Sequence, residues 1–278
     1  MATIHSLKKK LRVILSTKKL TKAMKTASTI KFSKLYSRYS DYEKYEEQCN
    51  KMYKSYRKDF NSVFSVDNPD APILYVLLSG NKGMCGGFNT ELMAFFEKIL
   101  RENEKKSVVL CCGKKGREYF ENKKIPCDNF YELSDLPSYS DAYGLFCDIK
   151  EMMESGKISG VKIIYPEYHN VVMQKPVCEN LFTFDEDTVT GEEPLFVPDR
   201  ETVINSMAEK VLVSILYKKM LETALGAQAA TLTTMRSAYD TACEYSAQLQ
   251  TQINRKRQSQ VTADVIENSS ENSMEGDV

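Results

Sequence analysis

Residues 3–63 contain neither proline nor glycine, the two residues that most strongly interrupt a helix. Apolar side chains recur along this stretch at alternating spacings of three and four: Ile4, Leu7, Leu11, Ile14, Phe32, Leu35, Tyr39, Tyr42, Cys49, Tyr53, Tyr56, Phe60 and Val63. Such a heptad-like stripe is typical of a coiled coil, because a helix that carries it cannot bury the stripe alone. The sequence therefore predicts one helix here, roughly 90 Å long at about 1.5 Å per residue, paired with another helix.

The stripe lapses in the middle of this helix. The positions that continue its spacing there are all polar: Lys18, Thr21, Lys25 and Ser28. Apolar residues shift instead to Leu20, Met24 and Ala27. We interpret the shift as a stutter, an irregularity that moves the seam around the helix.

A second helix is predicted from about Asp199 to Ala263, with Pro198 just before its start and Gly226 as its only glycine. Its apolar residues again form a seam: Leu225, Leu232, Met235, Ala242, Leu249 and Ile253. Two helices of similar length at opposite ends of one chain pair most simply as an antiparallel coiled coil.

The middle of the chain reads differently. Short apolar runs at 73–79, 107–113 and 161–166 alternate with helical patterns at 89–104, 114–122 and 139–155, the last closed by Gly156. This alternation predicts a parallel sheet with crossover helices. Residues 170–184 read as an extended edge segment, because Pro176 cannot occupy a central strand.

The predicted fold class is therefore α/β, with a long antiparallel two-helix coiled coil formed by the N- and C-terminal helices and an inserted Rossmann-like domain. The expected boundaries are 1–66 for the first coiled-coil helix, 67–198 for the α/β domain, 199–263 for the second helix and 264–278 for an acidic, disordered tail.

Charge is distributed unevenly although the net charge is zero. Residues 1–40 carry 11 Lys or Arg and no acidic residue, and residues 263–278 carry five acidic residues and no basic one. The basic helix could be a solvated face, a nucleic-acid-binding surface or a contact for an acidic protein partner. Its tyrosines follow the seam spacing, which favours core packing over a base-stacking platform.

The glycine-dense loop SGNKGMCGGFN, residues 79–89, follows the first predicted strand. It matches neither GxxxxGK[ST] nor GxGxxG, because Gly80, Gly83, Gly86 and Gly87 are spaced 3, 3 and 1 and no Ser or Thr follows a GK pair. We favour a structural role for these glycines over phosphate binding, with a contact surface as the second reading.

No catalytic site, cofactor site or metal site is predicted. The two histidines, His5 and His169, lie far apart, and none of the eight cysteines occurs in a CxxC pair. We expect reduced, mostly buried thiols. The longest apolar run, Ile73–Leu78, is far shorter than the about 20 residues that span a bilayer, so we expect a cytosolic protein or one held at a membrane by something else.

Several motifs in this order resemble those of one family, the gamma subunits of F-type ATP synthases. They are TKAM at 21–24 within the basic helix, GMCGGFN at 83–89, the Asn170, Gln174 and Pro176 positions of an N-x-x-x-Q-x-P hairpin, AQAATL at 227–232, and NRKRQSQVT at 254–262. The resemblance covers both ends and the middle of the chain.

The resemblance implies a non-catalytic central-stalk rotor subunit that couples rotation of a proton- or sodium-driven c-ring to ATP synthesis on the beta subunits. Implied partners are the alpha and beta subunits, the epsilon subunit and the c-ring, with no nucleic acid. The implied location is the cytoplasmic side of a bacterial inner membrane, held there only through the complex.

The resemblance also implies subunit contacts. The residues concerned are Lys18, Lys19, Lys22, Met24, Lys25, Met84, Cys85, Arg257, Gln258 and Thr262. The chain departs from the family where Ala227 and Thr231 replace a Glu and an Arg, and where its tail is acidic instead of apolar. A nucleic-acid-binding coiled coil and a nucleotide-binding α/β enzyme are the alternatives.

Overall fold

The computed structural model describes residues 3–63, 71–103, 107–181 and 196–274, with the side chains of 50, 52–63 and 267–274 excepted. Helix α1 spans Ile4–Val63 and helix α5 spans Arg200–Met274. The chain divides into two compact units, each with parts of both helices. Unit 1 comprises residues 1–27 and 234–278, and unit 2 comprises residues 28–233.

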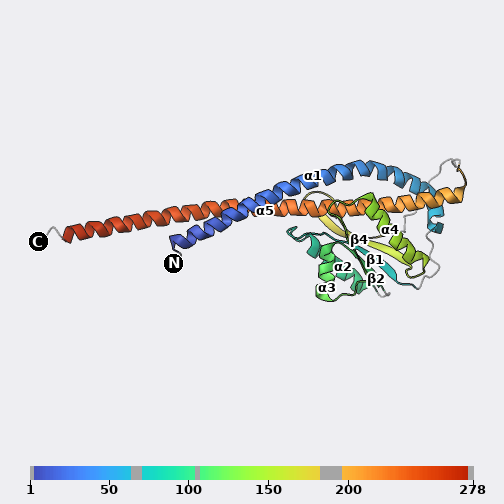
Figure 1. Ribbon diagram of the computed structural model, residues 1–278, viewed down its shortest axis with the longest axis horizontal. Coiled ribbons are helices and arrows are strands. Elements are labelled where there is room, and N and C mark those ends of the chain that lie inside the picture. The colour runs from blue at the N-terminus through green and yellow to red at the C-terminus, as the bar shows by residue number, and fades with distance from the viewer. Residues whose placement is uncertain (1–2, 64–70, 104–106, 182–195, 275–278) are drawn as a thin grey trace. The chain divides into compact units, whose positions relative to one another are not determined.

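Unit 2 is built around a five-stranded sheet in the order β3-β2-β1-β4-β5 (Figure 1). The strands are β1 (Ile73–Leu78), β2 (Ser107–Cys112), β3 (Asn129–Tyr131), β4 (Gly160–Tyr168) and β5 (Gln174–Asn180). The first four are parallel to their neighbours, and β5 pairs antiparallel with β4, with Pro166 opposite Pro176. The predicted Rossmann-like domain is confirmed, and Pro176 lies on an edge strand as expected. The part of the predicted edge segment beyond Leu181 lies outside the described residues.

Helices cover both faces of this sheet. Phe96 of α2 (Phe88–Glu102) and Phe120 of α3 (Lys114–Lys123) pack on one face, with ring centroids 5.3 Å apart. The other face is covered by α4 (Tyr139–Glu154) and by the first part of α5, through residues such as Phe146 and Leu216. This three-layer arrangement leaves the carboxyl ends of β1, β2 and β3 as the edge where loops gather (Figure 1).

In both units α1 and α5 pack in opposite directions. In unit 1, Leu7 contacts Leu249 and Ile253 near the start of α1. In unit 2, Leu35 packs with Leu221 and Leu225, and Cys49 lies in a separate cluster with Ile204, Ala208 and Val211. Residue numbers on α5 fall as those on α1 rise, so the predicted antiparallel pairing is confirmed. The predicted seam residues Tyr53, Tyr56, Phe60 and Val63 have side chains outside the described set.

The stutter prediction is wrong. Leu20 is 59% exposed and Ala27 is also exposed, whereas Thr21 and Ser28 are each only 6% exposed. The seam therefore continues in register through polar residues. Thr21 tolerates burial because its hydroxyl donates to the carbonyl oxygens of Thr17 and Lys18, at 3.0 and 3.1 Å.

The structure also differs at the C-terminal end. We expected the helix to end at Ala263 and a disordered tail to follow, but α5 continues to Met274. The reason is local: residues 264–274 are polar and acidic, yet they contain no proline or glycine, and the next glycine is Gly276. Residues 275–278 lie outside the described part of the chain.

Candidate functional site

The glycine-rich loop owes its shape to two left-handed residues. Gly86 has φ 59° and Met84 has φ 62°, the second being unusual for a residue with a side chain. Met84 is 60% exposed, whereas Cys85 is only 5% exposed. The side-chain Nδ2 of Asn89 donates to the Sγ of Cys85 at 3.2 Å. The predicted contact residues Met84 and Cys85 therefore differ in access: the Met84 side chain is exposed to solvent, and the Cys85 thiol is buried.

The backbone amides that could bind a phosphate at the start of α3 are already used. Helix N-termini bind anions through free N–H groups. The first three N–H groups of α3 donate to acceptors from the glycine-rich loop: Lys114 to Asn81 Oδ1 (3.1 Å), Lys115 to the Gly80 carbonyl (3.0 Å) and Gly116 to Ser79 Oγ (2.9 Å). The Gly80 N–H in turn donates to Asn89 Oδ1 at 3.1 Å. The geometry supports a structural role for this loop and leaves no nest for a phosphate at α3.

The start of α2 carries its own carboxylate. Glu91 lies in the first turn of α2, where a negative charge is favourable. A methyl group placed on Gly87 would come within 2.5 Å of the Glu91 Oε1 atom, so this carboxylate lies directly against the helix start. An incoming phosphate would meet it and be repelled.

Asp135 ties the loop to α1 inside unit 2. It forms ion pairs with Lys82 and, at 3.5 Å, with Lys31, and its Oδ1 accepts from Asn81 at 3.4 Å. Burial alone would raise the pKa of Asp135, but the Lys82 ammonium outweighs it and holds that pKa below its usual value. Asp135 therefore stays ionised near neutral pH and keeps the loop fixed.

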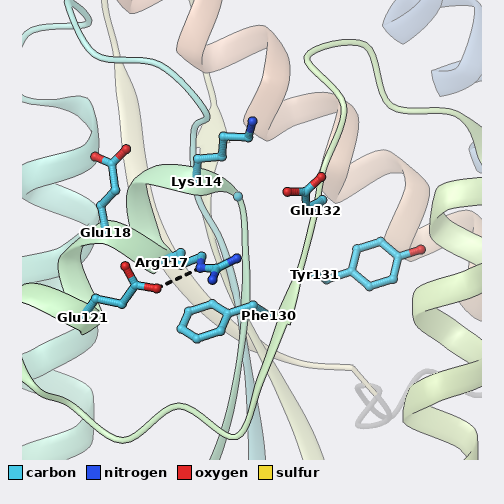
Figure 2. A pocket seen from close by; sticks show the side chains of 8 residues that line it. Lys114, Arg117, Glu118, Glu121, Phe130, Tyr131 and Glu132 are labelled. Atoms are coloured by element: carbon cyan, nitrogen blue, oxygen red, sulfur yellow. Dashed lines mark hydrogen bonds and ion pairs between the residues drawn. The ribbon is translucent and has the colours of Figure 1, made fainter.

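A pocket of about 270 Å³ opens beside this loop, at the ends of β2 and β3 (Figure 2). It is lined by Gly113, Lys114, Arg117, Glu118, Glu121, Phe130, Tyr131 and Glu132. Arg117 donates to Glu121 at 2.9 Å and lies over the Phe130 ring, 5.2 Å from its centroid. Figure 2 shows Tyr131 turned away from Arg117, and its hydroxyl donates to the Asp141 carbonyl at 3.2 Å. With its guanidinium engaged and three carboxylates on its wall, the pocket is poorly suited to an anionic cofactor.

Among the described residues no cluster of three or more His, Cys, Asp or Glu could hold a metal ion. The cysteines are free thiols, and Cys49, Cys85, Cys111 and Cys112 are buried. Burial raises the pKa of the Cys112 thiol well above its usual value, which keeps it protonated and unreactive.

The predicted basic contact residues separate into two groups in unit 1. Lys18 and Lys25 lie at seam positions, half-buried, with their ammonium groups 5.8 and 5.5 Å from the centroid of the Tyr239 ring. Lys19 and Lys22 lie on the outer side and are exposed. The first pair thus serves the coiled coil through cation–π contacts, and the second pair faces outward.

The exposed flank that holds Lys19 and Lys22 runs further along α1. At heptad spacing the same flank includes Lys8 and Arg12, both exposed. The opposite flank carries exposed Val13 and Leu20, each 59% exposed, and half-buried Met24 beside them. In this part of α1 the seam is polar, one flank is basic and the other is apolar.

The predicted C-terminal contact residues lie elsewhere in unit 1. Arg257, Gln258 and Thr262 are all exposed, and the Thr262 hydroxyl donates to the Gln258 carbonyl at 3.0 Å. Because Leu7 already meets Leu249 and Ile253, these residues lie past the beginning of α1, where α5 continues alone (Figure 1). The structure does not bring them together with Lys18–Lys25. Exposed Val261, Val265 and Ile266 accompany them.

Sequence reasoning missed several residues. Tyr239 was overlooked although it falls at seam spacing, four residues after Met235. Asn81 had no sequence signal, because its partners Leu133, Asp135 and Lys114 lie on segments that meet it only in the fold. Asn89 ends the motif GMCGGFN, but its contacts within the loop were not predicted. At the two departures from the family pattern, the Thr231 hydroxyl donates to the Ala227 carbonyl at 2.8 Å, a local bond within the helix.

Within the described residues, no helix is both long and apolar enough to cross a membrane. Residues 3–270 match the family described as ATP synthase. The chain is 25% identical over 272 residues to the ATP synthase gamma chain of Desulfitobacterium hafniense, covering 96% of this chain and 97% of the relative. It is 26% identical to that of Ruminococcus albus, covering 97% and 98%.

Solved structures resemble it as well. A chain of the Euglena gracilis mitochondrial ATP synthase, solved as OSCP/F1/c-ring in rotational state 3, aligns with a TM-score of 0.68 at 17% identity, covering 97% of this chain and 93% of that chain. A chain of the Tetrahymena thermophila central stalk and c-ring aligns with a TM-score of 0.59 at 19% identity, covering 79% and 99%.

Proposed function

The chain belongs to the ATP synthase gamma chain family, and we propose that it is the central-stalk rotor of an F-type ATP synthase. In this role it couples rotation of a c-ring, driven by protons or sodium ions, to ATP synthesis on the beta subunits. Its partners are the alpha and beta subunits of the head, the epsilon subunit and the c-ring.

The observation that carries this proposal is the outer surface of α1 in unit 1. Lys19 and Lys22 project from a flank that contains no acidic residue between residues 3 and 27. A flexible, hydrated ammonium group suits a contact that must form and break repeatedly, because its attraction is long-ranged and weakly directional. We assign this flank to an acidic loop of the beta subunits, with Met24 beside it.

Two further contacts complete the proposal. Met84 is the exposed tip of the glycine-rich loop, and we place it against a subunit of the head, with Cys85 behind it as support. Arg257, Gln258 and Thr262 lie where α5 continues past α1, and we assign them to the upper contact with beta. The exposed valines nearby suit an apolar sleeve.

The proposed role is non-catalytic. The N-terminus of α2, which follows β1, carries the carboxylate of Glu91. The first N–H groups of α3, which follows β2, donate to acceptors from the chain itself. Neither helix N-terminus therefore offers a nucleotide a binding site for its phosphates. We place the subunit at the cytoplasmic face of a bacterial inner membrane, bound through the c-ring and epsilon.

The test is reconstitution with the partner subunits. The isolated chain should neither bind ATP tightly nor hydrolyse it, and ATPase activity coupled to ion pumping should appear in the assembled complex. In that complex, Lys19→Glu with Lys22→Glu should reduce pumping severalfold while the chain's thermal unfolding stays unchanged. Robust ATPase activity of the chain alone would overturn the proposal, and unchanged pumping by the double variant would overturn the acidic-loop contact.

The same variant separates this proposal from nucleic-acid binding. A coiled coil that binds DNA through its lysines would lose affinity steeply with salt, and charge reversal at Lys19 and Lys22 would lower that affinity further. We expect only weak DNA binding at physiological salt.

A further inference from the structure

In unit 2, a run of polar side chains lies on the most deeply buried part of α5. Between Ser214 and Thr223 the helix passes between α1 and the sheet, and Ser214, Glu222 and Thr223 are at most 4% exposed. Polar groups are costly to bury, and an apolar residue would fill each position without that cost. Their presence calls for a role other than adding stability.

Two polar side chains of this stretch, Lys218 and Glu222, join α5 to α1. Lys218 forms an ion pair with Glu46, and the two side chains are only 19% and 12% exposed. One turn further on, the Tyr39 hydroxyl donates to Glu222 Oε1 at 3.2 Å. Both contacts lie on the side of α5 that faces α1, four residues apart.

A third side chain joins α5 to the sheet. Lys219 donates to the hydroxyl of Tyr165 on β4 and forms an ion pair with Glu179 on β5 at 2.8 Å. Tyr165 is fully buried, and its hydroxyl donates to Glu179 Oε1 at 2.8 Å. Lys218 and Lys219 thus point in different directions, one to α1 and the other to the β4–β5 pair.

The surrounding contacts between α1 and α5 are apolar, such as Leu35 with Leu221 and Leu225. Apolar packing is non-directional, so it resists separation more strongly than it resists sliding or rotation by one turn. A buried ion pair behaves in the opposite way. It adds little net stability, but any slip leaves a buried charge without its partner.

We propose that Lys218 and Lys219 are positioning residues that hold α1 and the sheet in register with α5, so that torque passes between these elements without slip. We call the two lysines and their partners Glu46, Tyr165 and Glu179 the register pins. The inference rests on the proposed rotor function, in which unit 2 must transmit a twisting load. The role proposed for the register pins is mechanical, and it is separate from any contribution that they make to the stability of the folded chain.

The test compares stability with coupling in the complete complex, assembled in inverted membrane vesicles. Lys219→Met and the pair Lys218→Met with Glu46→Met replace charges by apolar side chains of similar length. The paired methionine variant should keep the thermal unfolding midpoint of the chain, or raise it, because apolar replacement of a whole buried pair is neutral or stabilising. Lys219→Met removes one partner only and leaves Glu179 without its lysine, so it should lower the midpoint, and only modestly because the Glu179 side chain is 44% exposed. In both variants, pumping per ATP hydrolysed should fall severalfold.

A matched control uses an exposed ion pair on α1, the helix that also carries Glu46. Lys51→Met with Glu47→Met removes an ion pair whose side chains are 64% and 69% exposed, and it should leave both stability and coupling unchanged. The charge swap Lys218→Glu with Glu46→Lys should restore coupling, and it serves as the informative variant if the methionine pair fails to fold. Unchanged pumping per ATP in a stable Lys219→Met complex, or a swap that couples no better than the methionine pair, would overturn the register pins alone. A wild-type chain that fails to support coupled activity would overturn the proposed rotor function.

Discussion

The same two helices pack differently in the two units of the molecule. In unit 2, α5 is buried on nearly every side between Leu212 and Ala229, because α1 covers one side and the sheet covers another. In unit 1 the buried residues among the described side chains of α5 are only Met235, Ala242, Leu249 and Ile253, at spacings of seven, seven and four. A helix that holds a domain uses its whole circumference for packing, and a helix that meets partners keeps its flanks for them. The difference assigns stability to unit 2 and leaves the flanks of unit 1 exposed, where we propose the contacts with partner subunits.

The strongest test of this comparison is to replace one leucine by alanine in each unit. Leu216→Ala in unit 2 should lower the free energy of unfolding by about 2–5 kcal/mol, because it opens a cavity between α5 and the sheet. Leu20→Ala in unit 1 removes an exposed side chain and should change that free energy by less than about 0.5 kcal/mol. Urea unfolding followed by circular dichroism measures both. Equal losses would show that Leu20 is packed and that the comparison is false.

A second prediction concerns pH and rests on Glu222 in unit 2. Burial raises the pKa of Glu222 from its ordinary 4.5 to about 7, although Lys219 and Lys218 partly oppose this. One of its oxygens, Oε2, is buried without a hydrogen-bond partner among the described residues. Since the folded state holds the proton more tightly than the unfolded chain, the stability from this group is present below about pH 4.5 and is lost as the pH rises to about 7. The loss should be about 2–3 kcal/mol.

Glu222→Gln should remove that slope of unfolding free energy between pH 5 and pH 7.5. Tyr39→Phe should move the slope to higher pH, because the Tyr39 hydroxyl donates to the ionised carboxylate and lowers its pKa. Identical pH profiles for wild type and Glu222→Gln would contradict the assignment. Unit 1 can be followed separately with a reporter on its exposed flank, where no such slope is expected from Glu222.

A smaller effect is expected in the polar seam of unit 1. Tyr239→Leu removes the ring that Lys18 and Lys25 both approach, and it should cost about 1 kcal/mol of unfolding free energy. Tyr239→Phe keeps the ring and should cost much less. If the two variants are equally destabilised, the hydroxyl and not the ring face would be the important group.

The smallest predicted effect lies near the junction of the two units on α5. Ala227→Glu with Thr231→Arg restores the charged pair of the resembling family at spacing i,i+4. It should add about 0.2–0.5 kcal/mol to the free energy of unfolding, less at high salt. A gain in coupling without this small gain in stability would indicate that the pair acts on a partner and not on the helix.

The helices and strands that follow a period were predictable from the sequence. The seam of α1, the apolar strands β1, β2 and β4, and the edge position of Pro176 all follow from spacing, composition and backbone chemistry. Strand β3 was missed because Asn129–Tyr131 is too short to show any period. The lapse around Thr21 was misread because we expected a buried seam to be apolar, whereas a threonine can satisfy its own hydroxyl and a lysine can extend its aliphatic stem along the seam.

The site was less predictable than the fold. Spacing alone put Lys18 and Lys25 at seam positions, but we interpreted the seam as displaced there. The contacts of both ammonium groups with the Tyr239 ring show that these two lysines stay in the seam. Similarly, Met84 and Cys85 are neighbours, yet their exposure differs because Asn89 draws the thiol inward. The first distinction depends on a contact between segments far apart in the chain, and the second on the three-dimensional shape of a loop, and neither appears in a spacing pattern.

The occupied helix start at Lys114 has a consequence for the surroundings in which this chain is proposed to work. A doubly wound sheet with open amides at that edge would take up nucleotide whenever nucleotide is abundant, and its shape would then vary with the energy state of the cell. Because Asn81 and Ser79 fill those amides from within the chain, we expect no nucleotide to bind at this helix start. The dimensions of the domain should then be the same at high and at low ATP concentration.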